Sequence, residues 1–168
     1  MINFLFDVDG TLTPPRSKMD SDFDKFFGQW TVNQQSKGNK VFFVTGSDRR
    51  KTLEQVSISL YRLIDGSYQS CGNELYIRDR LVKYSQWKMP ADLHLDILEL
   101  LEESEWYGRA DNNIEERVGM VNISTVGRGA GRVLRKLYYD WDKRNFERVD
   151  IVDKLSKKYP DLSFAIGG

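Results

Sequence analysis

The chain has 168 residues, 40% of them hydrophobic, with 25 basic and 25 acidic side chains. This balance gives no overall field that would attract nucleic acid or an anionic membrane, so we expect neither as a partner. The hydrophobic content suffices for a packed core in one domain or two small ones. A single cysteine excludes an internal disulfide, and no apolar run approaches the ~18 residues of a membrane span. We therefore expect a soluble, cytoplasmic protein.

The first half of the chain alternates strand and helix patterns. Residues 2–6 predict a strand, residues 17–35 a helix, residues 40–44 a second buried strand and residues 49–60 a second helix. The order strand, helix, strand, helix is typical of an α/β fold in which a parallel sheet is doubly wound by helices.

Three shorter strand patterns follow, at 67–70, 74–77 and 80–84, with a turn at 78–79 between the last two. We therefore predict that residues 1–84 form the N-terminal part of a core domain.

From about residue 85 the pattern changes to that of an α+β module, which we expect to span residues 85–168. Its predicted elements are a helix that begins near Pro90, a strand over 118–125, a long polar helix over 140–158 and a last strand over 162–166. The apolar side chains of the long helix are expected to face inward: Phe146, Val149, Val152 and Leu155.

The most informative pattern lies directly after the first predicted strand. Asp7 and Asp9 are two residues apart, so in an extended segment both face one side, at the strand end where open α/β sheets bind ligands. Close carboxylates repel each other unless a proton or a cation lies between them, and Mg²⁺ shared with a substrate phosphate meets this need. The alternative is an Asx turn without chemistry, because Asp and Gly are common turn residues.

A second polar segment, residues 45–48, follows the second predicted strand and opens a helix. The hydroxyl groups of Thr45 and Ser47, with nearby backbone N–H groups, offer donors to an anion. The alternative is that Ser47 or Asp48 simply caps the helix. Beside the two aspartates, phosphate binding is the better interpretation.

Two motifs carry a family resemblance. Residues 7–13, Asp-Val-Asp-Gly-Thr-Leu-Thr, resemble the first motif of the haloacid-dehalogenase (HAD) superfamily of phosphotransferases. Residues 117–128 are similar to a signature of the eukaryotic-type phosphomannomutases, with Thr125 in place of the family's proline. Further similar segments occur at 158–162 and 164–168, so the resemblance spans nearly the whole chain.

This resemblance implies a HAD-like core with an α+β cap domain, and the interconversion of mannose 6-phosphate and mannose 1-phosphate. It implies that Asp7 is the nucleophile that forms an aspartyl-phosphate, that Asp9 is the general acid and base, and that both bind Mg²⁺. Thr45, with Ser47 as the second choice, would hold the transferred phosphoryl group. A hexose 1,6-bisphosphate is the implied activator and intermediate. Splitting one transfer into two steps, with proton transfer at each, supports these roles chemically.

The resemblance also implies which arginines hold the phosphate that is not reacting: Arg117, Arg128 and Arg135 in the cap, and Arg16 in a core loop. A guanidinium group binds phosphate with two parallel hydrogen bonds, which suits this role. The alternative for each is an ordinary solvated or ion-paired surface arginine. Enzymes of this family pair through their caps, so we expect a homodimer.

Other motifs of the family are absent from these 168 residues: a Ser and an Asp for the distal phosphate, a Lys beside the nucleophile and an acidic loop for Mg²⁺. We therefore expect a C-terminally incomplete core with impaired activity, because phosphoryl transfer depends on positioning and charge stabilisation. Two alternatives stay open: a sugar-phosphate phosphatase, in which water accepts the phosphoryl group, and a non-catalytic remnant that binds a phosphosugar or a partner. Arg117 and Arg128 favour the mutase, since a phosphatase has less need to hold a distal phosphate.

Overall fold

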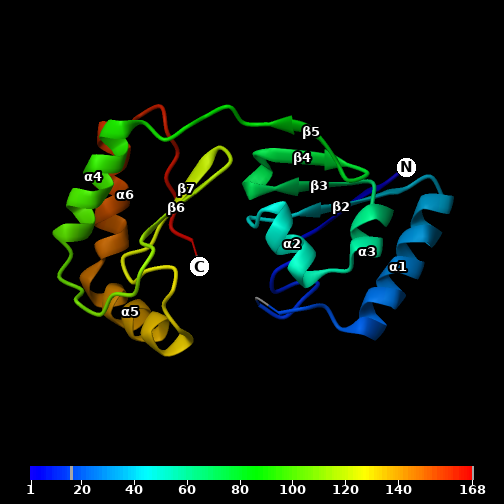
Figure 1. Ribbon diagram of the computed structural model, residues 1–168, viewed down its shortest axis with the longest axis horizontal. Helices are drawn as coiled ribbons and strands as arrows, with labels where there is room; N and C mark the ends of the chain where they lie inside the picture. The colour runs from blue at the N-terminus through cyan, green and yellow to red at the C-terminus, as the bar shows by residue number, and fades with distance from the viewer. Residues whose placement is uncertain (16, 168) are drawn as a thin grey trace. The chain divides into compact units, whose positions relative to one another are not determined.

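The computed structural model describes residues 1–15 and 17–167, which form two compact units (Figure 1). The first unit comprises residues 1–88 together with the short segment 117–120, and the second comprises the remainder. No helix in the described part of the chain is long and apolar enough to cross a membrane.

The first unit contains one five-stranded sheet in the order β1-β2-β3-β4-β5. Its strands are β1 (Asn3–Phe6), β2 (Lys40–Val44), β3 (Gly66–Gln69), β4 (Glu74–Ile77) and β5 (Arg80–Tyr84). The strand predictions for this half of the chain are thus confirmed. The first three strands are parallel, whereas β4 and β5 are antiparallel additions, because tight turns can join only antiparallel neighbours.

The helices of this unit are α1 (Ser21–Ser36), α2 (Arg49–Gln55) and α3 (Ile58–Leu63), with a 3₁₀ turn η1 (Ser70–Gly72). Two of the predicted helix boundaries were wrong. The first helix begins at residue 21 rather than 17, because the Asp20 carboxylate accepts hydrogen bonds from two N–H groups of the first turn. The helix predicted over 49–60 is interrupted at Val56, which is extended, and Ser57 caps the new helix α3.

Aromatic side chains form the core between α1 and the sheet. The ring of Phe27 lies 5.0 Å from that of Phe6, and the ring of Trp30 lies 5.1 Å from that of Phe4, both edge to face. Phe27 also contacts Phe43 of β2, which is fully buried. Such ring pairs are favourable beyond the apolar area that they bury, so they fix α1 against the two parallel strands.

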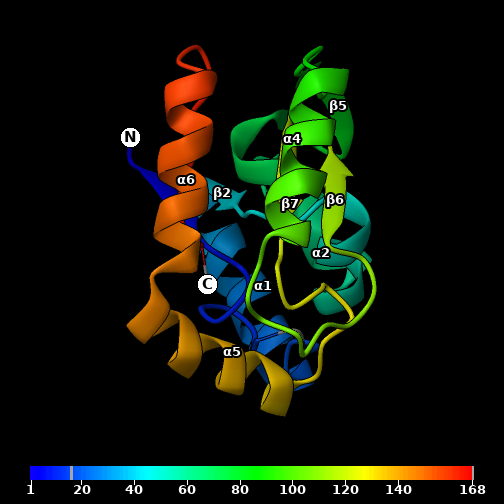
Figure 2. The same cartoon turned by 90° about the vertical axis from the view of Figure 1, so that its left-hand side faces the viewer.

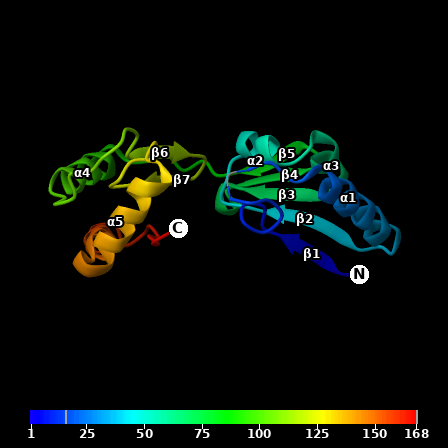
Figure 3. The same cartoon turned by 90° about the horizontal axis from the view of Figure 1, so that it is seen from below.

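The helices α1, α2 and α3 lie on one face of the sheet (Figure 3). The strand register places Leu5, Phe42 and Val44 on the opposite face, joined by Tyr68 and Ile77 from the neighbouring strands. Leu5 is 62% exposed, and Val44 and Ile77 are each 37% exposed. We call these five residues the open sheet face.

The two-residue turn between β4 and β5 consists of Arg78 and Asp79, with φ of 46° and 66°. Both left-handed values are typical of the tight hairpin turn predicted at this position. The Asp79 carboxylate accepts hydrogen bonds from Nε of Arg49 (2.9 Å) and Nε of Arg62 (3.3 Å), on α2 and α3. Arg49 in turn lies over the Tyr61 ring. The hairpin is therefore attached to both short helices.

The second unit contains the helices α4 (Ala91–Glu102), α5 (Arg132–Asn145) and α6 (Glu147–Lys158), and most of the hairpin strands β6 (Ile114–Arg117) and β7 (Met120–Ile123), whose tip, residues 117–120, groups with the first unit. Helices α4 and α6 lie side by side (Figure 2). Lys158 and Tyr159 both donate to the Asp96 carboxylate of α4, at 2.8 and 2.6 Å. These hydrogen bonds, that of Lys158 above all, lower the pKa of Asp96 because they stabilise its charged form.

Three predictions for the second half were wrong. Gly119, with φ of 69°, turns the chain between β6 and β7, so the strand predicted over 118–125 is shorter and belongs to a hairpin. The helix predicted over 140–158 is two helices, since Phe146 adopts a left-handed φ of 56° between α5 and α6. Residues 162–166 pair with no strand in the described part of the chain.

The break at Phe146 also changes which side chains are buried. Phe146 is 60% exposed and Val149 is 42% exposed, so they do not face inward as predicted, whereas Leu155 is buried. The Asp142 carboxylate stabilises the break, because it accepts hydrogen bonds from the backbone N (2.9 Å) and Nε (2.7 Å) of Arg148 in the first turn of α6.

We predict that Asp79→Asn lowers the free energy of unfolding by about 1–2 kcal/mol at pH 7. Burial alone would raise the pKa of Asp79, but the hydrogen bonds and charges of Arg49 and Arg62 outweigh it and lower this pKa below 3.8. A carboxyl whose folded pKa is lowered stabilises the fold above its unfolded pKa, and this contribution is lost as the pH falls through the folded value. Denaturant unfolding at pH 7 and below pH 3.8 should therefore show a difference from the parent protein that shrinks in acid; an equal difference at both would contradict it.

We also predict that Phe146→Gly raises the free energy of unfolding by about 0.5–1 kcal/mol. A left-handed conformation costs a residue with a Cβ about 1–2 kcal/mol, and the greater freedom of glycine in the unfolded chain offsets part of the gain. Phe146→Ala is the control, because alanine keeps the Cβ and should give no gain. Thermal unfolding of both variants measures the effect, and equal melting temperatures would refute this account of the break.

Candidate active site

The register of the parallel sheet brings two loops together at one edge. Phe6 at the end of β1 is paired with Phe43 of β2, so the chain leaves both strands at the same edge, through Asp7 and through Thr45. These loops are far apart in the sequence and adjacent in the structure. The edge is the one at which ligands bind in open α/β sheets.

The loop after β1 is wound around one backbone carbonyl. The Val8 oxygen accepts hydrogen bonds from the N–H groups of Leu12 and Thr13, each at 3.0 Å, and from the Thr13 hydroxyl at 3.2 Å. Gly10 allows this tight path, since its φ of 90° is unfavourable for other residues. We call residues 7–13 the aspartate loop.

Within this loop the two predicted aspartates have different surroundings. The Asp7 side chain is exposed and accepts hydrogen bonds from the Val8 N–H (2.9 Å) and the Thr11 hydroxyl (3.4 Å). Asp9 is half-buried, and its Oδ1 atom accepts a hydrogen bond from Nε2 of Gln55 at 2.9 Å. Asp7 is therefore accessible to solvent, whereas Asp9 is held from within the protein.

Gln55 is a site residue that the sequence did not indicate. It is the last residue of α2 and lies 46 positions beyond Asp9, with a second hydrogen bond from its Nε2 atom to the Thr13 hydroxyl at 3.2 Å. No motif marks it in the sequence, where it is one polar residue on a polar helix. Only the position at which α2 ends brings its amide to the aspartate loop.

The loop after β2, residues 45–48, is braced by the turn η1. The backbone N–H groups of Cys71 and Ser70 donate to the carbonyl oxygens of Thr45 (3.1 Å) and Ser47 (2.8 Å). The Ser47 N–H also donates to the Thr45 hydroxyl at 3.1 Å, and both side chains are buried. The N-cap of α2 is Asp48, whose carboxylate accepts from the Lys51 N–H at 2.8 Å, so Ser47 is not the helix cap.

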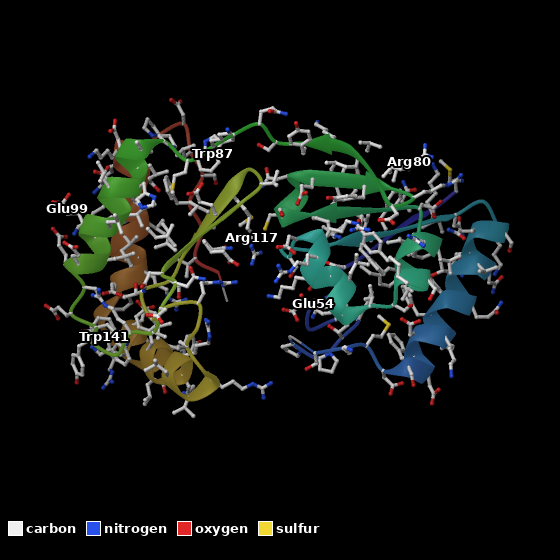
Figure 4. All side chains as sticks on the ribbon, in the orientation of Figure 1. Glu54, Arg80, Trp87, Glu99, Arg117 and Trp141 are labelled. Carbon is white, nitrogen blue, oxygen red and sulfur yellow. The ribbon has the colours of Figure 1, made fainter. Side chains whose placement is uncertain are left out.

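The predicted arginines have distinct partners where the structure describes them, and Arg16 lies outside the described residues. Arg117 belongs to the first unit, where its Nη1 atom donates to the Gly46 carbonyl at 2.6 Å (Figure 4).

The other two arginines lie in the second unit, where Arg128 forms an ion pair with Glu115 at 2.9 Å. Arg135 donates to the carbonyl oxygens of Ala130 (2.8 Å) and Arg128 (2.6 Å), and thereby holds the loop that carries Arg128.

These features define a class of protein. The fold matches that of the C-terminal domain of a trehalose-6-phosphate phosphatase from C. albicans with a TM-score of 0.57, over 95% of this chain and 51% of that chain. The two proteins are 16% identical, so the likeness is one of fold. The chain thus shares the α/β fold of that domain, with the aspartate loop after its first strand.

The sequence comparison identifies the family. The sequence model of the eukaryotic phosphomannomutases matches residues 28–168. The phosphomannomutase of Saccharomyces cerevisiae is 34% identical over 172 residues, and that of Encephalitozoon cuniculi is 28% identical over 173 residues. Each alignment covers 98% of this chain and 66% of the relative. The chain belongs to the eukaryotic phosphomannomutase family, and it spans just under two thirds of the length of these relatives.

Proposed function

We propose that the chain takes part in the interconversion of mannose 6-phosphate and mannose 1-phosphate through an aspartyl-phosphate on Asp7. The observation that carries this proposal is the shared sheet edge. In this member of the family, the chain that leaves β1 carries the exposed carboxylate of Asp7 and, two residues later, the carboxyl of Asp9. The loop that follows β2, with its hydroxyl groups, begins at the same end of the sheet. A nucleophile, an acid–base group and a phosphate-binding loop are the parts that such a transfer requires.

The proposed reaction has two halves. In the first, an oxygen of Asp7 bonds to phosphorus while the bond from phosphorus to the sugar oxygen breaks, and Asp9 gives its proton to that oxygen. In the second, Asp9 takes the proton from a sugar hydroxyl, whose oxygen bonds to phosphorus and releases the Asp7 carboxylate. The Thr45 hydroxyl, which can still donate while it accepts from the Ser47 N–H, holds the phosphoryl group during both steps.

Family membership implies Mg²⁺, and the donor set fits this ion. Asp7 offers a hard carboxylate oxygen and Asp9 a hard backbone carbonyl oxygen, while the Asp9 carboxyl stays available for proton transfer; in the described part of the chain no group of three or more His, Cys, Asp or Glu side chains forms a larger metal site. Mg²⁺ is commonly held by one or two carboxylates, with substrate phosphate and water completing its shell. When bound, it would neutralise charge on the phosphoryl oxygens. We propose a hexose 1,6-bisphosphate as the activator on the same grounds.

We further propose that residues 1–84 act as the core and residues 85–168 as the cap that holds the distal phosphate. Support comes from the loop that follows β7. Arg135 fixes the backbone of that loop, and the charge of Arg128 is paired with the Glu115 carboxylate, for which a phosphate can substitute. Arg135 is thus assigned mainly to holding the loop, and Arg128 to binding the anion.

We predict that Asp7→Asn abolishes covalent labelling of the protein. Incubation of the parent chain with ³²P-labelled hexose bisphosphate and Mg²⁺ should give a phosphoprotein that hydroxylamine cleaves, as an acyl phosphate requires. Asp7→Asn should reduce the labelling by at least about 10³-fold, because an amide is a far weaker nucleophile. Mass spectrometry of a peptide that contains residue 7 locates the label.

Asp22→Asn is the matched control, because Asp22 is an exposed aspartate on α1 whose ion-pair partner is the exposed Lys25. It should be labelled like the parent. Undiminished labelling of Asp7→Asn would overturn the proposed nucleophile. Release of inorganic phosphate regardless of the activator would instead favour the phosphatase, and no labelling of the parent chain would favour the binding remnant.

We also predict that Arg128→Ala weakens the binding of mannose 1-phosphate by about 10-fold or more, since a hydrogen bond to a charged group is worth about 1.5–3 kcal/mol. The melting temperature should change little, because Arg128 and Glu115 are partly exposed. Isothermal titration calorimetry measures the affinity. Arg132→Ala, at the exposed first residue of α5, is the control and should bind like the parent. Equal affinities for all three proteins would remove Arg128 from the site.

A further inference from the structure

Gln55 is a buried residue that contacts Asp9. Its side chain is 5% exposed, and Nε2 donates both to Oδ1 of Asp9 (2.9 Å) and to the Thr13 hydroxyl (3.2 Å). Its backbone carbonyl accepts a hydrogen bond from the Met19 N–H at 2.7 Å. The amide thus reaches across the aspartate loop from a backbone that is itself held in place.

The orientation of this amide follows from its neighbours. The Thr13 hydroxyl already donates to the Val8 carbonyl, so it is an acceptor toward Gln55. A flipped amide would place its oxygen against a carboxylate oxygen of Asp9, and two acceptors repel. Nε2 must therefore face Asp9.

The oxygen atom of the same amide indicates that Gln55 is not the residue that would stabilise the fold most at this position. Oε1 of Gln55 is buried and has no hydrogen-bond partner among the described residues. A buried acceptor without a protein donor costs about 1–3 kcal/mol, so its presence calls for an explanation beyond the packing of the side chain. An apolar side chain of the same length would fill this position without that cost.

We propose that Gln55 is a positioning residue that holds the Asp9 carboxyl in one rotamer for proton transfer. The inference rests on the proposed function and deepens it. An amide N–H can only donate, so Oδ1 of Asp9 must accept in both protonation states. The transferable proton is therefore confined to Oδ2. That proton passes from Oδ2 to the sugar oxygen as the oxygen–phosphorus bond breaks, and it returns to Oδ2 from the incoming hydroxyl in the second half.

The chain offers a matched control. Gln35, near the end of α1, donates through Nε2 to the Leu63 carbonyl (2.9 Å) and to Oδ2 of Asp65 (3.1 Å). Gln35→Met and Gln55→Met therefore each remove a glutamine–aspartate hydrogen bond and replace it by a flexible apolar side chain of similar length. Only one of the two bonds lies in the aspartate loop.

The kinetic test compares two phosphoryl donors in single-turnover labelling of Asp7. Mannose 1-phosphate has a sugar oxygen that must be protonated as it leaves, whereas acetyl phosphate releases a stable carboxylate that needs no proton. Gln55→Met should slow labelling by the hexose phosphate about 10- to 100-fold, since positioned acid–base groups contribute about 10²–10⁴-fold. Labelling by acetyl phosphate should change less than about 3-fold by the same reasoning, and Gln35→Met should change neither. Equal slowing with both donors, or no slowing, would overturn the inference.

A second measurement separates this inference from the proposed function. In ¹H–¹⁵N spectra, Asp9→Asn should shift the side-chain amide signals of Gln55, and Asp65→Asn should shift those of Gln35 instead. Neither spectrum depends on turnover or on the folding of Gln55→Met. If the parent protein is labelled by neither donor, the proposed function fails, and these spectra alone decide whether Gln55 holds Asp9. Gln55 signals that do not respond to Asp9→Asn would refute the positioning role.

Discussion

The parallel pairing of β1 with β2 is the constraint on which the rest of the first unit depends. It fixes the register of Asn3–Phe6 against residues 40–43, and so determines where both site loops begin. The pairing is held by aromatic rings on α1, where Phe27 contacts residues of both strands. Parallel strands need a long connection between them, and here α1 serves as that connection and as the cover over their buried face. One helix therefore secures both the core and the geometry of the site.

Each site loop is held by a segment distant in sequence rather than by its own residues alone. The loop over residues 45–48 depends on η1, where Ser70, Cys71 and Gly72 all have left-handed φ values, of 50°, 57° and 88°. Such values cost a residue with a side chain about 1–2 kcal/mol. They persist because the resulting turn directs two N–H groups at the carbonyl oxygens of this loop. The strained backbone of η1 therefore helps to fix the conformation of the loop over residues 45–48, and strained residues are common near functional sites.

The elements that could be predicted from the sequence are those that one local pattern of residues determines. The apolar runs of β1 and β2 are short and bounded by turn residues, so their placement, and with it the common edge of Asp7 and Thr45, could be predicted. Helix ends were less predictable, because a single capping carboxylate such as that of Asp20 outweighs several residues of helical pattern. The break at Phe146 was missed for a related reason, since a bulky residue rarely adopts a left-handed conformation. Gln55 could not be found at all, because its contact with Asp9 arises only from tertiary structure.

The open sheet face has a thermodynamic consequence of its own. Leu5, Phe42 and Val44 keep part of their apolar surface in water, so the sheet gains from hydrophobic burial mainly on the side that α1 covers. Any molecule that covers this face in the folded state, and cannot bind the unfolded chain, stabilises the fold by mass action. The melting temperature of the first unit would then rise with the concentration of such a molecule, and two residues of this face, Leu5 and Val44, lie within two positions of the site loops. Stability of this unit would therefore report on the occupancy of its open sheet face as well as on its core.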